Sequence, residues 1–187
     1  MLLRILTLCA ALVSPLCLFG VPTRPEIPSQ SFDVTAHGVV ADGVTDNASA
    51  LQKLFDDVSA AGGGRVVFPA SEKAYLAGPL KLRSKIELHL EKGATLSPLP
   101  YGGDSAPRTY PVPAAGQRYT HFLTAEKVED IAITGQGTIE GNGRAWWDAY
   151  RANKQMPGRP YLVRIIGTER VLLSGITLSN SPMFHVG

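Results

Sequence analysis

The feature of this sequence that most restricts its fold is a strand–turn–strand pattern that occurs three times. The copies are SKIELHLEKGATLSP, EDIAITGQGTIEG and ERVLLSGITLSNSP, and they begin at residues 84, 129 and 169. Their apolar positions align, with Ile86, Ile131 and Val171 in the first strand and Leu96, Ile139 and Leu178 in the second. The copies are 45 and 40 residues apart. Since a solenoid coil takes roughly 20–25 residues, each interval fits two coils, or one coil with an excursion.

This repetition predicts an all-β protein, specifically a right-handed parallel β-helix. In such a solenoid each strand pairs with the equivalent strand one coil further along, so inward apolar side chains stack in rows. The stretches YTHFLTA and YLVRIIG supply strands between the repeats. A β-sandwich is the alternative. Its hairpins usually carry Asn-Gly or Asp-Gly turns, whereas Asp42-Gly43 precedes a helical pattern here.

One amphipathic helix is predicted before the first coil, over residues 47–60. Its apolar residues fall at the i, i+3, i+4 and i+7 positions of one face, as Leu51, Leu54, Phe55 and Val58. Three consecutive glycines, residues 62–64, then favour helix termination. Because the first coil of a solenoid exposes its apolar end, we expect this helix to cap it.

The N-terminus divides the chain into three segments. Residues 1–20 combine a basic start with an apolar run that is short for a membrane span, which predicts a cleaved secretory signal; an N-terminal anchor is the alternative. Residues 21–31 read as a linker, and 32–187 as the β-helix domain, whose first structured element is expected over residues 32–36. Cys9 and Cys17 both lie in the predicted signal. We therefore expect a secreted protein, extracellular or periplasmic, with neither a disulfide nor a thiolate metal site.

Composition and motifs argue against several classes of function. The net charge is only +2 and no Lys/Arg run occurs, so we expect no nucleic-acid partner. The histidines lack metal-ligand spacing, and the glycines of TGQGTIEGNG precede a strand instead of a phosphate-binding helix. Asp42 and Asp46 suit a turn and a helix cap better than a calcium loop. We expect no metal, no cofactor, no membrane contact after signal cleavage and, for the complete protein, a monomer.

The segment GRAWWDAYRANK, residues 143–154, combines aromatic and basic side chains. These side chains suit stacking on sugar rings and attraction of carboxylates. The alternative is a loop whose tryptophans cover the flank of the solenoid.

Residues 32–187 resemble family 28 glycoside hydrolases, the polygalacturonase group. The resemblance rests on ITGQGTIEGNGRAWWDAY, an Arg-Pro pair, and the ordered motif Asn-Ser-Pro-x-Phe-His. It implies a parallel β-helix that hydrolyses α-1,4-galacturonosyl linkages of pectic polysaccharide or oligogalacturonides with inversion of configuration. One carboxylic acid then protonates the leaving oxygen while carboxylate base activates water.

The chain departs from this family by lacking its catalytic segments. The Asn-Thr-Asp-Gly-x-Asp, Asp-Asp, Gly-His-Gly and Arg-x-Lys motifs are absent. No catalytic residue is therefore assigned, and we expect an inactive N-terminal portion, truncated on its C-terminal side. Asn180 and His185, by motif, and Trp147 are the substrate-binding candidates; a corner residue bonded to backbone groups is the alternative for Asn180. A β-helical uronate lyase or epimerase and a non-catalytic glycan-binding β-helix remain alternative functions.

Overall fold

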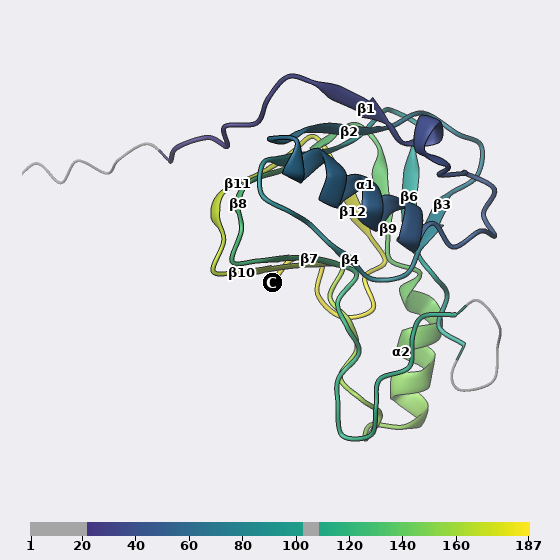
Figure 1. Cartoon of the computed structure of the whole chain (residues 1–187). Helices are drawn as coiled ribbons and strands as arrows, with labels where there is room; N and C mark the ends of the chain where they lie inside the picture. The colour runs from purple at the N-terminus through teal and green to yellow at the C-terminus, as the bar shows by residue number, and fades with distance from the viewer. Residues whose placement is uncertain (1–21, 103–108) are drawn as a thin grey trace, which may run out of the picture.

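A computed structural model describes residues 22–102 and 109–187, and these residues form a parallel β-helix (Figure 1). The predicted signal and both cysteines lie outside the described residues. Sheet A contains β1 (Ser31–Asp33), β2 (Gly64–Phe68), β5 (Ile86–Leu90), β8 (Glu129–Gly135) and β11 (Glu169–Ser174), in that order. Sheet B contains β3 (Tyr75–Ala77), β6 (Thr95–Pro98), β9 (Thr138–Glu140) and β12 (Thr177–Ser179). Sheet C contains β4 (Leu80–Lys81), β7 (Leu123–Glu126) and β10 (Val163–Ile166).

The strand register confirms the repeat alignment. In sheet A, Ile131 lies opposite both Ile86 and Val171, and in sheet B, Ile139 lies opposite both Leu96 and Leu178. Each interval between copies is therefore one coil with an excursion, not two coils. A coil without an excursion runs from β2 to β5, where Val66 pairs with Leu88 of the next coil.

The core follows from the two-residue period of the strands. In β5, Ile86, Leu88 and Leu90 are fully buried, whereas Glu87 and His89 point outward and stay partly exposed. Parallel pairing places the buried residues Val66, Leu88 and Ile133 of β2, β5 and β8 opposite one another, so apolar side chains stack along the axis of the β-helix. Burial of this stack is the main source of stability.

Helix α1 (Ala48–Ala60) packs its predicted apolar face against the first coil. The four predicted positions are buried: Leu51, Leu54, Phe55 and Val58. The helix contacts β2 and β4, which agrees with a capping role. Asp46 accepts the amide of Ala48 and that of Gly78, each at 2.9 Å. Asp42 accepts the amides of Val44 and Thr45. Asp42 therefore stabilises a turn, and Asp46 bonds to the first amide of α1.

Two predicted elements differ from the structure near the N-terminus and in residues 143–154. The first structured element, expected over residues 32–36, divides in two: β1 ends at Asp33, and a short 3₁₀ turn, η1 (Val34–His37), follows because the Asp33 carboxylate accepts the Thr35 amide at 2.8 Å. The alternative interpretation of residues 143–154 as a loop is wrong, because most of this segment forms helix α2 (Gly143–Ala152). Neither α1 nor α2, the α-helices in the described part of the chain, is long and apolar enough to cross a bilayer.

Two excursions leave the β-helix on the same side, between sheets B and C. The first covers residues 99–122 and the second, which contains α2, covers residues 141–162. They pack together, since the Tyr119 amide donates to the Gly158 carbonyl at 3.1 Å. Trp146 on α2 is fully buried, with ring centroids 4.5 Å from Tyr101 and 4.6 Å from Tyr119. Figure 1 shows α2 projecting away from the coils beside the first excursion.

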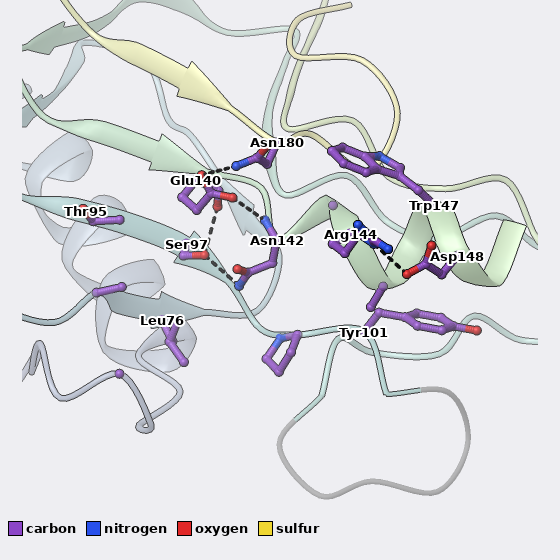
Figure 2. Close-up of a pocket in the computed structure, with 15 residues that line it drawn as sticks. Leu76, Thr95, Ser97, Tyr101, Glu140, Asn142, Arg144, Trp147, Asp148 and Asn180 are labelled. Atoms are coloured by element: carbon purple, nitrogen blue, oxygen red, sulfur yellow. Dashed lines mark hydrogen bonds and ion pairs between the residues drawn. The ribbon is translucent and has the colours of Figure 1, made fainter. Parts of the chain in front are cut away.

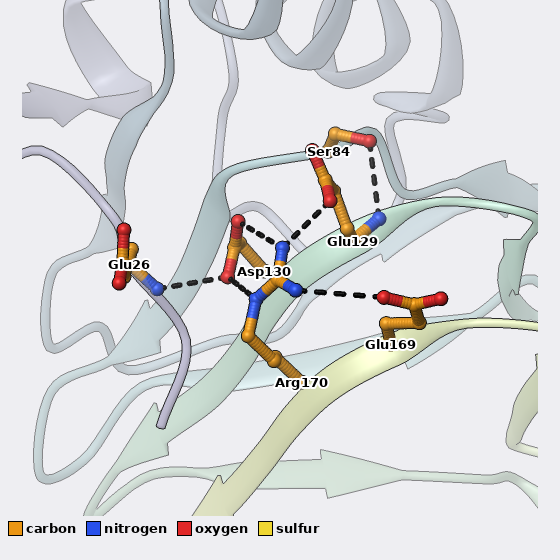
Figure 3. A network of polar contacts seen from close by, with 6 residues as sticks. All are labelled: Glu26, Ser84, Glu129, Asp130, Glu169 and Arg170. Atoms are coloured by element: carbon orange, nitrogen blue, oxygen red, sulfur yellow. Dashed lines mark hydrogen bonds and ion pairs between the residues drawn. The ribbon is translucent and has the colours of Figure 1, made fainter. Parts of the chain in front are cut away.

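A residue in the left-handed region lies at or just before the start of β5, β8 and β11 in sheet A. Lys85, Asp130 and Arg170 have φ values of 61°, 57° and 52°, and their neighbours in sequence pair across β5, β8 and β11. Figure 3 shows Arg170 bound to Asp130 and Glu129, while the Glu26 amide donates to Asp130 at 2.9 Å. The segment predicted as a linker is thus bound to the coil that contains β8.

Candidate functional site

An open cleft of about 910 Å³ lies along sheet B at the N-terminal end of α2, and we call it the sheet-B cleft (Figure 2). Strands β3, β6 and β9 and the residue after β12 line one part of it, and the two excursions line the other. Parallel stacking places residues 76, 97, 140 and 179 of successive coils in one row, and Asn180 follows directly after this row. The cleft therefore depends on the repeat and on both excursions.

Glu140 is the centre of hydrogen bonding in the sheet-B cleft. Its carboxylate accepts from Ser179 Oγ at 2.5 Å, from Asn180 Nδ2 at 3.0 Å and from the Asn142 amide at 3.1 Å. Asn180 has a φ of 45° and is a corner residue, but its side-chain partner is this carboxylate and not the backbone. Three donors from two coils hold Glu140 in one position.

Asn142 and Ser97 fix the corner where β9 leads into α2. Asn142 has a φ of 49°, and its Nδ2 donates to Ser97 Oγ at 2.9 Å and to the Pro98 carbonyl at 3.0 Å. Ser97 is buried and donates to the Glu140 carbonyl. A Cβ on Gly143 would lie 2.4 Å from the Asn180 carbonyl oxygen, so only glycine permits this close approach.

Helix α2 contributes an aromatic side chain and an ion-paired carboxylate. Trp147 is half-buried and donates through Nε1 to the Ser181 carbonyl at 3.0 Å. Asp148 accepts from Arg144 at 2.8 Å and from Arg151 at 2.6 Å. The hydrogen bond from Arg144, reinforced by both positive charges, lowers the pKa of Asp148, so its carboxylate is ionised near neutral pH.

This arrangement suits the binding of a polar chain better than acid–base catalysis. A general acid needs a raised pKa, and the Asp148 pKa is lowered instead. Glu140 already accepts three hydrogen bonds. Within residues 22–102 and 109–187, no group of His, Cys, Asp or Glu side chains is arranged to hold a metal ion.

The structure brings together two of the three candidate residues named from the sequence. Trp147 and Asn180 both line the sheet-B cleft. The exposed His185 is not among the lining residues; its carbonyl accepts the Val163 amide at 2.9 Å, which extends sheet C. His185 therefore lies near this corner of the fold but outside the cleft.

Sequence reasoning missed Glu140, Asn142, Ser97 and Tyr101. A signal existed for Glu140, because the alternation in Thr138-Ile139-Glu140 directs it outward on sheet B. Tyr101 and Asn142 belong to excursions, whose course the repeat does not determine. Their place in the cleft became visible only with the packing of the two excursions.

The family model for glycosyl hydrolases family 28 matches residues 66–187. The chain belongs to glycosyl hydrolases family 28. The matched residues of this family 28 chain include every strand of sheet B, helix α2 and the residue after β12. Almost the whole sheet-B cleft thus lies within the family match.

Related proteins carry polygalacturonase names. The family 28 chain is 31% identical over 174 residues to "Probable polygalacturonase" of Vitis vinifera, covering 84% of this chain and 34% of that protein. It is 29% identical over 180 residues to an endo-polygalacturonase of Pectobacterium carotovorum, covering 88% of this chain and 42% of that protein. The chain therefore spans about a third to two fifths of these relatives.

Solved structures agree with the fold. An exopolygalacturonase from Thermotoga maritima superposes with a TM-score of 0.69 at 25% identity, covering 87% of this chain and 44% of that one. The polygalacturonase from Erwinia carotovora has a TM-score of 0.63 at 24% identity, covering 88% and 46%, and it supports the fold alone. The prediction of a parallel β-helix is confirmed.

Proposed function

We propose that this family 28 chain binds pectic polysaccharide along the sheet-B cleft, as the N-terminal part of a secreted polygalacturonase-type hydrolase. The observation that carries the proposal is the meeting of Trp147, Asn180 and Glu140 in one open cleft. The polygalacturonase names of the relatives support a galacturonan ligand, and the α-1,4 linkage is what the family resemblance implies. An oligogalacturonide would occupy the cleft as the smallest ligand.

The cleft offers the groups that such a ligand requires. Trp147 and Tyr101 present apolar ring surface, which suits the faces of pyranose rings. Arg144, whose side chain is 81% exposed, supplies a cation for sugar carboxylates although it also pairs with Asp148. The Asn180 amide supplies a further polar contact for hydroxyl groups. Together these groups suit a carbohydrate chain, and the acidic character of the proposed ligand follows from the names of the relatives.

We propose further that the 187-residue chain does not hydrolyse its ligand. Inverting hydrolysis requires an acid and a base roughly 6.5–9.5 Å apart, with room for water between them. The carboxylate motifs that the family resemblance leads us to expect are not in this sequence. Glu140 and Asp148 are engaged in hydrogen bonds and ion pairs that suit binding.

Titration with oligogalacturonides, combined with a reducing-end assay, tests this proposal. We expect saturable binding without release of reducing ends. Trp147→Ala and Asn180→Ala should each weaken binding, whereas Lys53→Ala on the remote face of α1 should not. Absence of binding, or turnover above the blank, would contradict the proposal. An unsaturated, ultraviolet-absorbing product abolished by chelator would indicate the uronate lyase alternative instead.

Secretion belongs to the same proposal and has its own test. Expression with residues 1–20 in a secreting host should release a chain whose N-terminus begins after Gly20, the cleavage site we expect. Retention of residues 1–20 on a membrane-bound product would favour the anchor alternative.

A further inference from the structure

A second cleft, of about 310 Å³, lies at the C-terminal end of α2. Three cationic side chains line it, those of Arg118, Lys154 and Arg159. Tyr150 and Met183 add apolar surface, and the lining contains no acidic residue. We call it the basic cleft. The basic cleft draws on both excursions. Arg118 lies in the first excursion, and Tyr150, Lys154 and Arg159 lie in the second, whereas Met183 follows β12.

The cations of the basic cleft have no carboxylate partner among the described residues. Lys154 Nζ lies 4.1 Å from the centroid of the Tyr150 ring, and the Arg159 guanidinium lies 4.3 Å from it. Arg159 also donates to the Pro182 carbonyl at 2.7 Å. None of the ion pairs in residues 22–102 and 109–187 includes Arg118, Lys154 or Arg159.

This pattern contrasts with the rest of α2. Arg144 and Arg151 share Asp148, so each of these arginines has a carboxylate partner. The second excursion, residues 141–162, contains four basic residues and one acidic residue, whereas the whole chain has a net charge of only +2. Positive charge is therefore concentrated at this end of the fold. Clustered cations repel one another, and an anion bound between them would relieve that repulsion.

The environment of His121 gives a second sign of this positive potential. His121 lies beside the junction of the two excursions, where its Nδ1 accepts the Tyr161 amide at 2.9 Å. Burial lowers the pKa of His121, and the charges of Arg164 and Arg118 lower it further. The charge of Arg118 thus acts on His121, and no carboxylate among the described residues pairs with Arg118.

One short segment connects the basic cleft to the sheet-B cleft. Asn180 lines the sheet-B cleft and Met183 lines the basic cleft. Between them, the Ser181 carbonyl accepts from Trp147 and the Pro182 carbonyl accepts from Arg159, so both clefts hold this segment in place. Three residues span at most about 10 Å. A single extended ligand can therefore contact both clefts.

We propose that the basic cleft binds a free carboxylate of the same acidic oligosaccharide that occupies the sheet-B cleft. The inference rests on the proposed function and deepens it, because it selects uronate units with unesterified carboxylates. Guanidinium groups bind carboxylates through paired, charge-assisted hydrogen bonds, and a methyl ester loses the charge. The basic cleft would thereby discriminate between de-esterified and esterified ligand.

Calorimetric titration of the intact 187-residue chain tests this inference with four probes: hexagalacturonate, its methyl ester, an alginate hexamer and maltohexaose. The test variant is Arg118→Gln/Lys154→Gln, since neither side chain carries a hydrogen bond that the fold uses. The matched control is Arg65→Gln/Arg83→Gln, which removes the same charge from arginines that pair with Glu87 and Asp56, away from both clefts. The single variants Arg118→Gln and Lys154→Gln and thermal melts guard against misfolding.

We expect hexagalacturonate to bind the wild type about tenfold or more tightly than the test variant, and the control variant to change affinity little. The methyl ester should bind the wild type and the test variant equally. Equal weakening by the test and control variants, or undiminished binding in a folded test variant, would overturn the proposed carboxylate binding by the basic cleft. Either result would leave the proposed function intact. Binding of the alginate hexamer alone, weakened only by the test variant, would support the basic cleft and reject the galacturonan ligand.

Discussion

Arg170 binds Asp130 through two hydrogen bonds across neighbouring coils, with Nε 2.6 Å from Oδ1 and Nη2 3.0 Å from Oδ2. The pair joins β11 to β8 at the start of both strands, and the Glu26 amide adds a third donor to Asp130 (Figure 3). Asp130 is 2% exposed. The Asp130 carboxylate therefore joins the N-terminal segment to the coils that contain β8 and β11.

Acid should weaken this junction in a defined pH range. The Arg170 hydrogen bond lowers the pKa of Asp130 from 3.8 to about 2. Because the folded pKa lies below the unfolded one, the unfolded chain binds more protons between those values, and stability falls as pH drops from about 4 to about 2. Urea unfolding midpoints measured from pH 6 to pH 2 should show this loss, on the order of 1–2 kcal/mol.

The variant Asp130→Asn should lower stability at pH 6 and flatten the acid-dependent part of that curve. Asparagine tolerates the left-handed φ of 57° at this position, so the backbone is preserved. Glu129→Gln is the matched control, because Glu129 also binds Arg170 but its side chain is 48% exposed. An equal effect of both variants would contradict the assignment of the pH dependence to Asp130.

Gly135→Ala should disrupt the turn between β8 and β9. Gly135 has a φ of 107°, and an added Cβ would lie 1.9 Å from the Leu90 carbonyl oxygen of the preceding coil. Backbone strain and overpacking together predict a loss of roughly 3 kcal/mol or more. Gly116→Ala is the control: its φ is 77° and nothing lies within 4 Å, so it should lose only about 1–2 kcal/mol. Chemical denaturation distinguishes the two.

The adjacent tryptophans should separate stability from binding. Trp146 is fully buried among tyrosines, so Trp146→Ala should lower the free energy of unfolding by about 3–5 kcal/mol. Trp147 is only half-buried and lines the sheet-B cleft, so Trp147→Ala should destabilise less and weaken oligogalacturonide binding more. Thermal melts and titrations of both variants check this; a larger stability loss for Trp147→Ala would contradict it.

The junction of the two excursions should loosen on mild acidification. Burial, followed by the charges of Arg164 and Arg118, lowers the folded-state pKa of His121. The unfolded chain then binds the extra proton first, so the junction loses stability as pH falls below about 6.5. Hydrogen-exchange protection of the Tyr161 amide should fall between pH 7.5 and 5.5. His121→Asn, whose side-chain oxygen can also accept this amide, should abolish the pH dependence; its persistence would implicate another group.

The coils could be predicted from the sequence because their signals are local and repeat. Alternation in Ile86–Leu90 and the aligned turn glycines give strand identity and register, and both are confirmed. Helix α1 was predictable from its apolar face. Helix α2 was missed because its stability comes from Trp146 packing against Tyr101 and Tyr119, which are distant in sequence. Such tertiary packing overrides a local reading.

The site was predictable only in part for the same reason. Asn180 and Trp147 could be named from motifs, whereas Glu140 and Asn142 gain their place from hydrogen bonds across coils. His185 lies on the extension of sheet C, outside the cleft. Motif matching finds residues near a corner, and the direction of each strand decides which of them reach the ligand.

The most direct test of the account is NMR of the ¹⁵N-labelled chain titrated with hexagalacturonate. The account predicts saturable shifts of the Trp147 indole N–H and the Asn180 side-chain amide, with an almost unchanged Trp146 indole N–H and no new reducing ends. Shifts confined to residues remote from the sheet-B cleft, such as those of α1, or cleavage of the ligand during the titration, would contradict it.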